Sequence, residues 1–210
     1  MNTRIMRIAR HRMGSDGQGV STLVAFWGCP LKCRYCINDF CHNPNTRCEE
    51  LDPEQLVCRL MTDEIYYRLT GGGVVFGGGE PLLNSRYIRN VIELLPDDIP
   101  IRVETSLNVR WEDIEILYGM IDEWIIDVKD LNPEIYLRYT GLSNENVIVN
   151  CKRLVEQYRL CGEDSRRHLI FRVPLIPGYN TPEDVEKSAE VLKKLGIVDR
   201  FTYKKPEENR

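Results

Sequence analysis

The chain has 210 residues, of which 42% are hydrophobic and 29% are charged, and its net charge is -4. This length and balance are typical of one globular domain with a sizeable core, so we treat residues 1–210 as a single domain. The net charge provides no overall attraction to nucleic acid or to an anionic membrane surface. No apolar run approaches the roughly 20 residues that span a bilayer. We therefore expect neither nucleic acid nor a membrane as a partner.

The order of predicted elements begins with the basic segment 1–13, which lacks the apolar centre of a secretion signal and favours a first strand. Asp52 and Pro53 have the residue types of a helix N-cap and first helical position. Apolar runs predict strands at 20–27, 74–76, 101–105, 124–128, 168–174 and 200–203. Periodic segments predict helices at 53–69, 87–95, 111–119, 132–139, 144–161 and 182–195.

This alternation of strand and helix predicts an α/β fold with a parallel sheet covered by helices. Six strands are too few for a closed eight-unit barrel, and a partial (β/α)6 TIM-like barrel with parallel strands fits the length. In such folds the chemistry lies at the carboxyl ends of the strands. The polar and glycine-rich segments of this chain follow its strands, where that edge is expected.

The first of these segments contains Cys29, Cys33 and Cys36, with the spacing C-x3-C-x2-C. Three thiolates on one short loop can hold three corners of a four-iron cluster and leave one iron open, much as a catalytic zinc keeps a free position. A zinc site usually takes four ligands in paired C-x2-C units, and no second pair follows here. We predict these three cysteines as metal ligands. An exposed cluster of this kind is sensitive to oxygen, which favours an anaerobic or microaerobic setting.

The chain has eight cysteines, and without a signal peptide they argue against a disulfide scaffold and for the reducing cytoplasm. A second metal site built from Cys41 and Cys48 is one alternative, and free thiols are the other. Cys151 and Cys161 are expected to pack on a helix. No histidine receives a catalytic role.

The second segment is Gly77-Gly78-Gly79-Glu80, directly after a predicted strand. Glycine lets the backbone approach a ligand closely and adopt angles closed to other residues. The Glu80 carboxylate can accept hydrogen bonds from an ammonium group. The alternative is a tight turn between strand and helix.

A third segment ends the strand predicted at 124–128. Alternate residues of a strand share a face, so Asp127 and Lys129 share one face and the apolar Trp124, Ile126 and Val128 the other. Unpaired buried charge is costly, so we expect either a salt bridge, mutual or with a neighbouring residue, or a ligand role. For Arg172, on a later strand, the residue type by itself predicts a structural ion pair.

Together these motifs resemble the radical S-adenosylmethionine superfamily. The three cysteines match its cluster loop, and Tyr35 matches the aromatic position near the adenine. Gly78, Gly79 and Glu80 match its motif for the methionine amino group.

The resemblance narrows to the glycyl-radical enzyme activating enzymes, of the pyruvate formate-lyase activating type. Asp16 to Ser21 keeps the aspartate and both glycines of that family's D-G-P-G-x-R run, but not its proline or arginine. Glu104-Thr105 replaces the family's D-T pair, and Asp127-Val128-Lys129 matches its D-x-K motif. Arg172 stands five residues before Pro177-Gly178, as in the family.

The resemblance implies a [4Fe-4S] cluster, S-adenosylmethionine and a monovalent cation held with the help of Glu104, Thr105 and Asp127. It implies reductive cleavage to a 5′-deoxyadenosyl radical that removes a hydrogen atom from a backbone glycine of a partner glycyl-radical enzyme. A flavodoxin or ferredoxin is the implied electron donor. The implied cofactor-binding residues are Tyr35, Gly78, Gly79, Glu80, Glu104, Thr105, Asp127, Lys129 and Arg172.

Two other functions remain open. The departures at Asp16 to Ser21 and at Glu104 leave room for a radical enzyme that modifies a ribosomal peptide or a small molecule. A different class is a non-catalytic iron–sulfur or zinc module, against which the missing fourth cysteine argues. The segment 201–210 has no legible motif.

Overall fold

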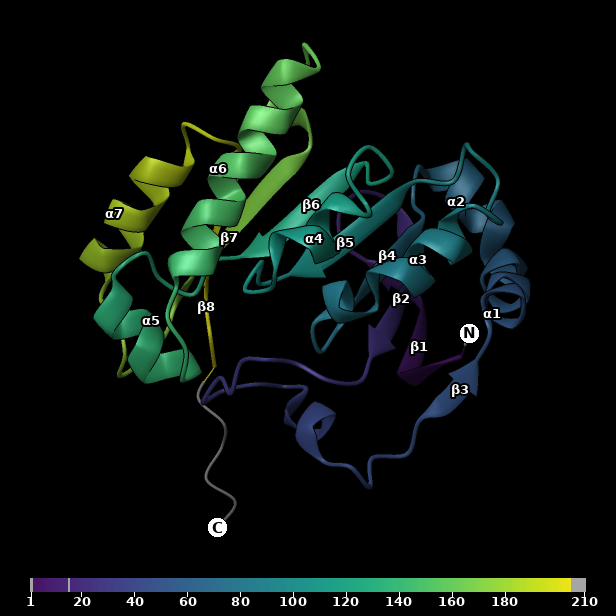
Figure 1. Ribbon diagram of the computed structural model, residues 1–210, viewed down its shortest axis with the longest axis horizontal. Coiled ribbons are helices and arrows are strands. Elements are labelled where there is room, and N and C mark those ends of the chain that lie inside the picture. Colours follow the sequence, from purple (N-terminus) through teal and green to yellow (C-terminus); the bar gives the residue numbers. More distant parts are fainter. Residues whose placement is uncertain (1, 15, 205–210) are drawn as a thin grey trace. The chain divides into compact units, whose positions relative to one another are not determined.

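The computed structural model in Figure 1 describes residues 2–14 and 16–204, so the end of the C-terminal segment, 205–210, lies outside the described residues. The strands are β1 Thr3–Met13, β2 Val20–Phe26, β3 Glu49–Leu51, β4 Val74–Gly78, β5 Ile101–Thr105, β6 Glu123–Asp127, β7 Leu169–Leu175 and β8 Ile197–Thr202. The α-helices are α1 Pro53–Leu60, α2 Glu64–Thr70, α3 Ser85–Ile92, α4 Trp111–Glu115, α5 Pro133–Thr140, α6 Glu145–Leu160 and α7 Pro182–Leu192.

The strands form one eight-stranded sheet in the order β3-β1-β2-β4-β5-β6-β7-β8. The pairs β2–β4, β4–β5 and β7–β8 are parallel. Because β3 and β8 stand at the two ends of this order, the sheet is open. The predicted α/β fold with an open, partial barrel is confirmed.

The prediction of parallel strands throughout is wrong at one end of the sheet. Strand β1 pairs antiparallel with both β2 and β3. The segment 14–19 between β1 and β2 is too short for the crossover that parallel neighbours need, so the two strands form a hairpin. Strand β3 was not predicted, because three residues are too few to show an alternating pattern.

The helix predicted at 53–69 is divided into α1, a 3-10 turn Met61–Asp63 and α2. Its start is confirmed: the Asp52 side chain accepts a hydrogen bond from the Gln55 N–H in a capping box, and Pro53 is the first helical residue. At the turn, the buried side chain of Asp63 accepts two hydrogen bonds from the Arg10 guanidinium on β1. The break in the helix therefore places the Asp63 carboxylate against strand β1 of the sheet.

The chain divides into two compact units. The first contains β1 to β5 and α1 to α4, and its core includes Val24, Phe26, Phe76 and Ile88, all fully buried. The second contains α5 to α7, β7 and β8, with α7 packed against both strands. Cys29 belongs to the first unit, and Cys33 and Cys36 belong to the second. A single domain over 1–210 stays a prediction.

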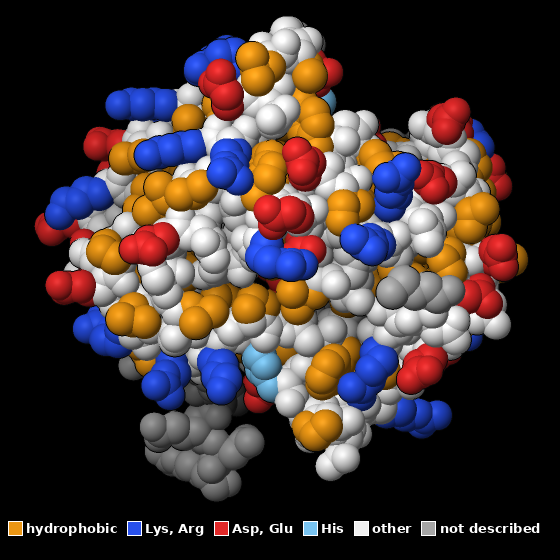
Figure 2. All heavy atoms as spheres, viewed as in Figure 1, with side chains coloured by type: hydrophobic (Ala, Val, Ile, Leu, Met, Phe, Trp, Pro, Cys, Tyr) orange, Lys and Arg blue, Asp and Glu red, His pale blue; other side chains and the backbone are white. Residues whose placement is uncertain are grey.

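The described surface mixes both signs of charge. Figure 2 shows acidic and basic side chains interspersed with hydrophobic ones over the visible face. Across residues 2–14 and 16–204, no helix is both long enough and apolar enough to pass through a bilayer.

Candidate active site

The glycine-rich segment packs directly on the start of the cysteine loop, within the first unit. The Gly79 N–H donates to the Phe26 carbonyl at 2.9 Å, and the Glu80 N–H donates to the Gly28 carbonyl at 2.7 Å. A Cβ atom on Gly79 would lie 2.2 Å from that same Gly28 oxygen. Only glycine fits at position 79, and the close approach is to the backbone of the chain itself.

The Glu80 carboxylate is fixed at the carboxyl ends of β4 and β5. Its Oε1 accepts hydrogen bonds from the Thr105 hydroxyl at 2.6 Å and from the Leu82 N–H at 3.3 Å. A Cβ on Gly77 would lie 3.2 Å from Oε2 of Glu104, so the absence of a side chain there makes room for Glu104. The fold brings Glu80, Glu104 and Thr105 to one edge of neighbouring strands.

An arginine outside the sequence motifs neutralises Asp16. Asp16 is buried, and Arg12 of β1 donates to both of its carboxylate oxygens through Nε and Nη2. The hydrogen bond to Asp16 raises the pKa of the Arg12 guanidinium. Arg12 stands directly opposite Ser21 across the β1–β2 pair. Sequence reasoning missed Arg12, because the antiparallel hairpin that places it there was not predicted.

In the second unit, the cysteine loop is held against the end of α5. The Lys32 N–H donates to the Thr140 carbonyl at 2.8 Å, and the Arg34 N–H donates to the Tyr139 carbonyl at 3.2 Å. These carbonyls belong to the last turn of α5, where helix acceptors lack partners within the helix. The Tyr35 hydroxyl donates to the Pro177 carbonyl at 3.0 Å. The loop thus has fixed anchors on both sides of Cys33.

The predicted charged pair forms just beyond β6. Nζ of Lys129 donates to Oδ2 of Asp127 at 2.9 Å and to the Tyr203 hydroxyl at 2.7 Å. The other Asp127 oxygen, Oδ1, is buried and has no hydrogen-bond partner among the described residues. Burial would lower the pKa of Lys129, but Asp127 and Tyr203 outweigh it and the pKa is raised well above its usual value. The mutual salt bridge is confirmed, and it leaves one acceptor open.

Two further predicted positions lie close to this pair. Burial raises the pKa of the Cys33 thiol to about 11, and the Lys129 charge opposes that shift. The Arg172 carbonyl on β7 accepts the Val128 N–H at 3.0 Å, which places the Arg172 backbone beside the residue between Asp127 and Lys129. Tyr203 was missed, because no motif marks the end of the last strand.

The cysteines differ in exposure. Cys29, Cys33 and Cys36 are partly exposed, whereas Cys41 and Cys151 are buried. Within the described parts of the chain, no three His, Cys, Asp or Glu side chains lie close enough to hold a metal ion. The assignment of the cluster ligands, and of any site at Cys41 and Cys48, stays a prediction.

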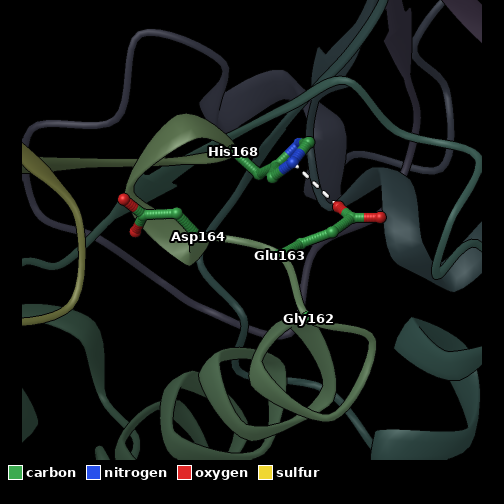
Figure 3. A pocket seen from close by; sticks show the side chains of 4 residues that line it. All are labelled: Gly162, Glu163, Asp164 and His168. Atoms are coloured by element: carbon green, nitrogen blue, oxygen red, sulfur yellow. Dashed lines mark ion pairs between the residues drawn. The ribbon is translucent and has the colours of Figure 1, made fainter.

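A separate pocket, drawn in Figure 3, is lined by Gly162, Glu163, Asp164 and His168. His168 points toward Glu163, with 3.0 Å between Nε2 and Oε2, while Asp164 points away. The His168 ring also stacks on Tyr158 with 4.5 Å between centroids. This pocket lies at the amino end of β7, whereas the predicted chemistry lies at carboxyl ends of strands. Its histidine is a packed, paired side chain.

Comparison with known proteins defines the class to which this fold and site belong. The pattern of the radical SAM superfamily matches residues 24–203. The chain belongs to the radical SAM superfamily of enzymes. It is 26% identical to the (2S)-3-sulfopropanediol dehydratase activating enzyme of Klebsiella oxytoca, over 86% of this chain and 74% of that protein. It is 27% identical to the pyruvate formate-lyase-activating enzyme of Clostridium pasteurianum, over 88% and 74%.

Solved structures agree on the fold. A domain of the pyruvate-formate lyase-activating enzyme from Bacteroides vulgatus is 26% identical, with a TM-score of 0.53 over 65% of this chain and 86% of that one. Streptococcus suis SuiB bound to S-adenosylmethionine is 17% identical, with a TM-score of 0.63 over 89% of this chain. The present chain spans 43% of the length of SuiB, and this likeness shows the fold alone.

Proposed function

We propose that this chain is the activating enzyme of a glycyl-radical enzyme. In this reaction a hydrogen atom is removed from a backbone glycine of the partner protein after reductive cleavage of S-adenosylmethionine. The observation that carries the proposal is the match of 86% and 88% of the chain to two proteins that are named activating enzymes. The motifs beyond the cysteine loop and the Gly-Gly-Glu segment support it.

The residues at the strand ends fit the cofactors of this reaction. Thiolates are the usual ligands of iron–sulfur clusters, and we propose Cys29, Cys33 and Cys36 as the three protein ligands of a [4Fe-4S] cluster. The open oxygen of Asp127 is a buried acceptor that lacks a partner among the described residues, as expected at a site completed by a ligand. When bound, the cluster supplies the electron for cleavage of the cofactor.

The remaining residues would bind and orient the cofactor. Glu80, with its carboxylate held by Thr105, is suited to accept hydrogen bonds from an amino group. Arg172 is suited to a carboxylate, because its guanidinium forms paired hydrogen bonds with two oxygens. We propose contacts to S-adenosylmethionine for Tyr35, Gly78, Gly79, Lys129 and Arg172, and a monovalent cation near Glu104, Thr105 and Asp127.

The cellular setting follows from this chemistry. We propose that a flavodoxin or ferredoxin delivers the electron, and that the chain acts in the reducing cytoplasm of anaerobically grown cells. The thiolate ligands and an open iron require such a setting.

The test begins with anaerobic reconstitution with iron and sulfide. We expect about four iron atoms per chain, and formation of 5′-deoxyadenosine after addition of dithionite and S-adenosylmethionine. Cys33→Ala should lose both iron and product. Cys58→Ala, at an exposed cysteine of α1, is the matched control and should keep both.

The substrate is tested with the glycyl-radical enzyme encoded by the same organism. The expected signal is a glycyl radical in that partner, detected by electron paramagnetic resonance. A cluster-replete protein that forms no 5′-deoxyadenosine would falsify the radical reaction. The other outcome is formation of 5′-deoxyadenosine without a glycyl radical. If a peptide encoded by a neighbouring gene, or a small molecule, is modified instead, the chain is a radical enzyme that modifies that peptide or small molecule.

A further inference from the structure

Lys129 is held by a residue that lies outside every recognised motif. Its Nζ donates to the hydroxyl of Tyr203 at 2.7 Å, and the two residues are 74 positions apart in the chain. The ammonium also lies 5.3 Å from the centroid of the Tyr203 ring. Asp127 supplies the only other hydrogen bond that Lys129 makes among the described residues, at 2.9 Å.

Lys129 is buried, so its hydrogen bond to Tyr203 matters for the stability of the charged side chain. The Lys129 side chain is 9% exposed, and that of Asp127 is 33% exposed. A buried ammonium is costly unless it is paired and hydrogen-bonded. Asp127 provides the charge, and the Tyr203 hydroxyl provides a neutral acceptor.

Tyr203 is itself fixed by contacts that also reach the cysteine loop. Its backbone N–H donates to the Leu175 carbonyl at 2.9 Å. Its ring centroid lies 6.3 Å from that of Tyr139 and 5.2 Å from that of Phe201. The Tyr139 carbonyl accepts the Arg34 N–H between Cys33 and Cys36, so Tyr139 links the position of Tyr203 to that of the loop.

Lys129 and Asp127 each keep one hydrogen-bonding group that could contact a ligand. An ammonium has three N–H donors, and two are used within the described residues. Oδ1 of Asp127 is an open acceptor beside it. Among the described residues, the pair therefore presents one N–H donor of Lys129 and one acceptor of Asp127 that are not yet used.

We propose that Tyr203 is a positioning residue, which holds the Lys129 ammonium against Asp127 so that its third N–H is directed at the bound cofactor. This inference rests on the proposed function, in which Lys129 contacts S-adenosylmethionine. Tyr203 touches Lys129 and is not itself a catalytic residue.

The first experiment needs no cofactor and measures the exposure of Lys129 directly. The protein as purified is treated with a reductive methylation reagent, and mass spectrometry follows Lys129 with the exposed Lys204 as internal reference. We expect Tyr203→Phe to raise the rate at Lys129 about tenfold, which corresponds to the loss of one hydrogen bond to a charged group. Tyr179→Phe is the matched control, because that ring also packs on Tyr139, at 5.1 Å.

The second experiment measures the dissociation constant of S-adenosylmethionine on the reconstituted enzyme. We expect an increase of about tenfold in Tyr203→Phe and no change in Tyr179→Phe. Tyr203→His, which restores a polar acceptor, should recover part of both effects. Circular dichroism of each variant checks that it is folded, and Tyr203→Leu, which also removes the hydroxyl, replaces the phenylalanine variant if the latter is not.

The outcomes separate the two proposals. An unchanged rate at Lys129 in folded Tyr203→Phe overturns the positioning role. A faster rate with unchanged cofactor affinity also overturns it, because Lys129 is then not directed at the cofactor. A wild-type enzyme that binds no S-adenosylmethionine contradicts the proposed function, while the methylation result still decides whether Tyr203 holds Lys129.

Discussion

Asp63 and Asp127 are two acids with opposite hydrogen-bonding states. Asp63 lies in the turn between α1 and α2, and its side chain is 1% exposed. Its Oδ1 contacts Arg10 at 2.5 Å and His11 at 3.1 Å, and its Oδ2 contacts Arg10 at 2.8 Å and Thr22 at 2.9 Å. Among the described residues, the Asp127 side chain accepts a hydrogen bond from Lys129 through Oδ2, and its Oδ1 has no hydrogen-bond partner.

This difference separates an acid that serves the fold from one available to a ligand. The partners of Asp63 lie on β1 and β2, so the carboxylate joins the hairpin to the helical turn. His11 has a φ of 56° where β1 departs from regular pairing, and its contact with Asp63 helps to hold that conformation. Buried polar atoms are nearly always paired, so the oxygen of Asp127 that lacks a partner among the described residues supports the proposed ligand role.

The largest expected effect on stability comes from Asp63→Asn. The amide would direct N–H groups at the Arg10 or Thr22 donors, so two hydrogen bonds to a charged acceptor are lost at a buried position. We expect the free energy of unfolding to fall by about 2–3 kcal/mol, measured by urea denaturation. A loss below about 0.5 kcal/mol would contradict the structural role of Asp63.

The second prediction is the pH dependence of the same contact. The hydrogen bond from Arg10 lowers the pKa of Asp63, although burial opposes this. The stabilisation is therefore complete above the unfolded value of about 3.9 and is lost as the pH falls through the lower folded value. Arg10 is half exposed, so solvent screening makes this loss smaller than that caused by Asp63→Asn. Stability measured from pH 5 downward should be flatter in Asp63→Asn than in the wild type.

The smallest effect on stability is expected from Asp127→Asn, the same chemical change at the other acid. Its carbonyl oxygen can still accept from Lys129, and the new NH2 group takes the place of the open oxygen. Lys129 keeps a hydrogen bond but loses its charge partner, and Asp127 is partly exposed, so we expect a loss of about 1 kcal/mol in unfolding free energy. We also expect a fall of about tenfold in 5′-deoxyadenosine formation. A loss of stability as large as that of Asp63→Asn would remove the distinction between the two acids.

Secondary-structure elements were predictable from sequence where the residues that define them lie within one short segment. Strand β5, Ile101–Thr105, was predicted with its observed ends, and the Asp52 cap with Pro53 was predicted from residue types alone. The break at 61–63 was not, because it depends on an arginine some fifty positions earlier in the chain. The antiparallel pairing of β1 was also missed, since the direction of pairing depends on the strand beside it.

By itself, the sequence determined the superfamily and predicted the site, because the Cys29–Cys36 spacing and the Gly-Gly-Glu and Asp-Val-Lys motifs are short and contiguous. Tertiary structure alone decided which groups complete that site. Gly79 is required by the Gly28 carbonyl, and Tyr203 supports Lys129 across 74 residues. The physical reason is that burial and hydrogen-bond partners depend on segments distant in sequence, which no local pattern specifies.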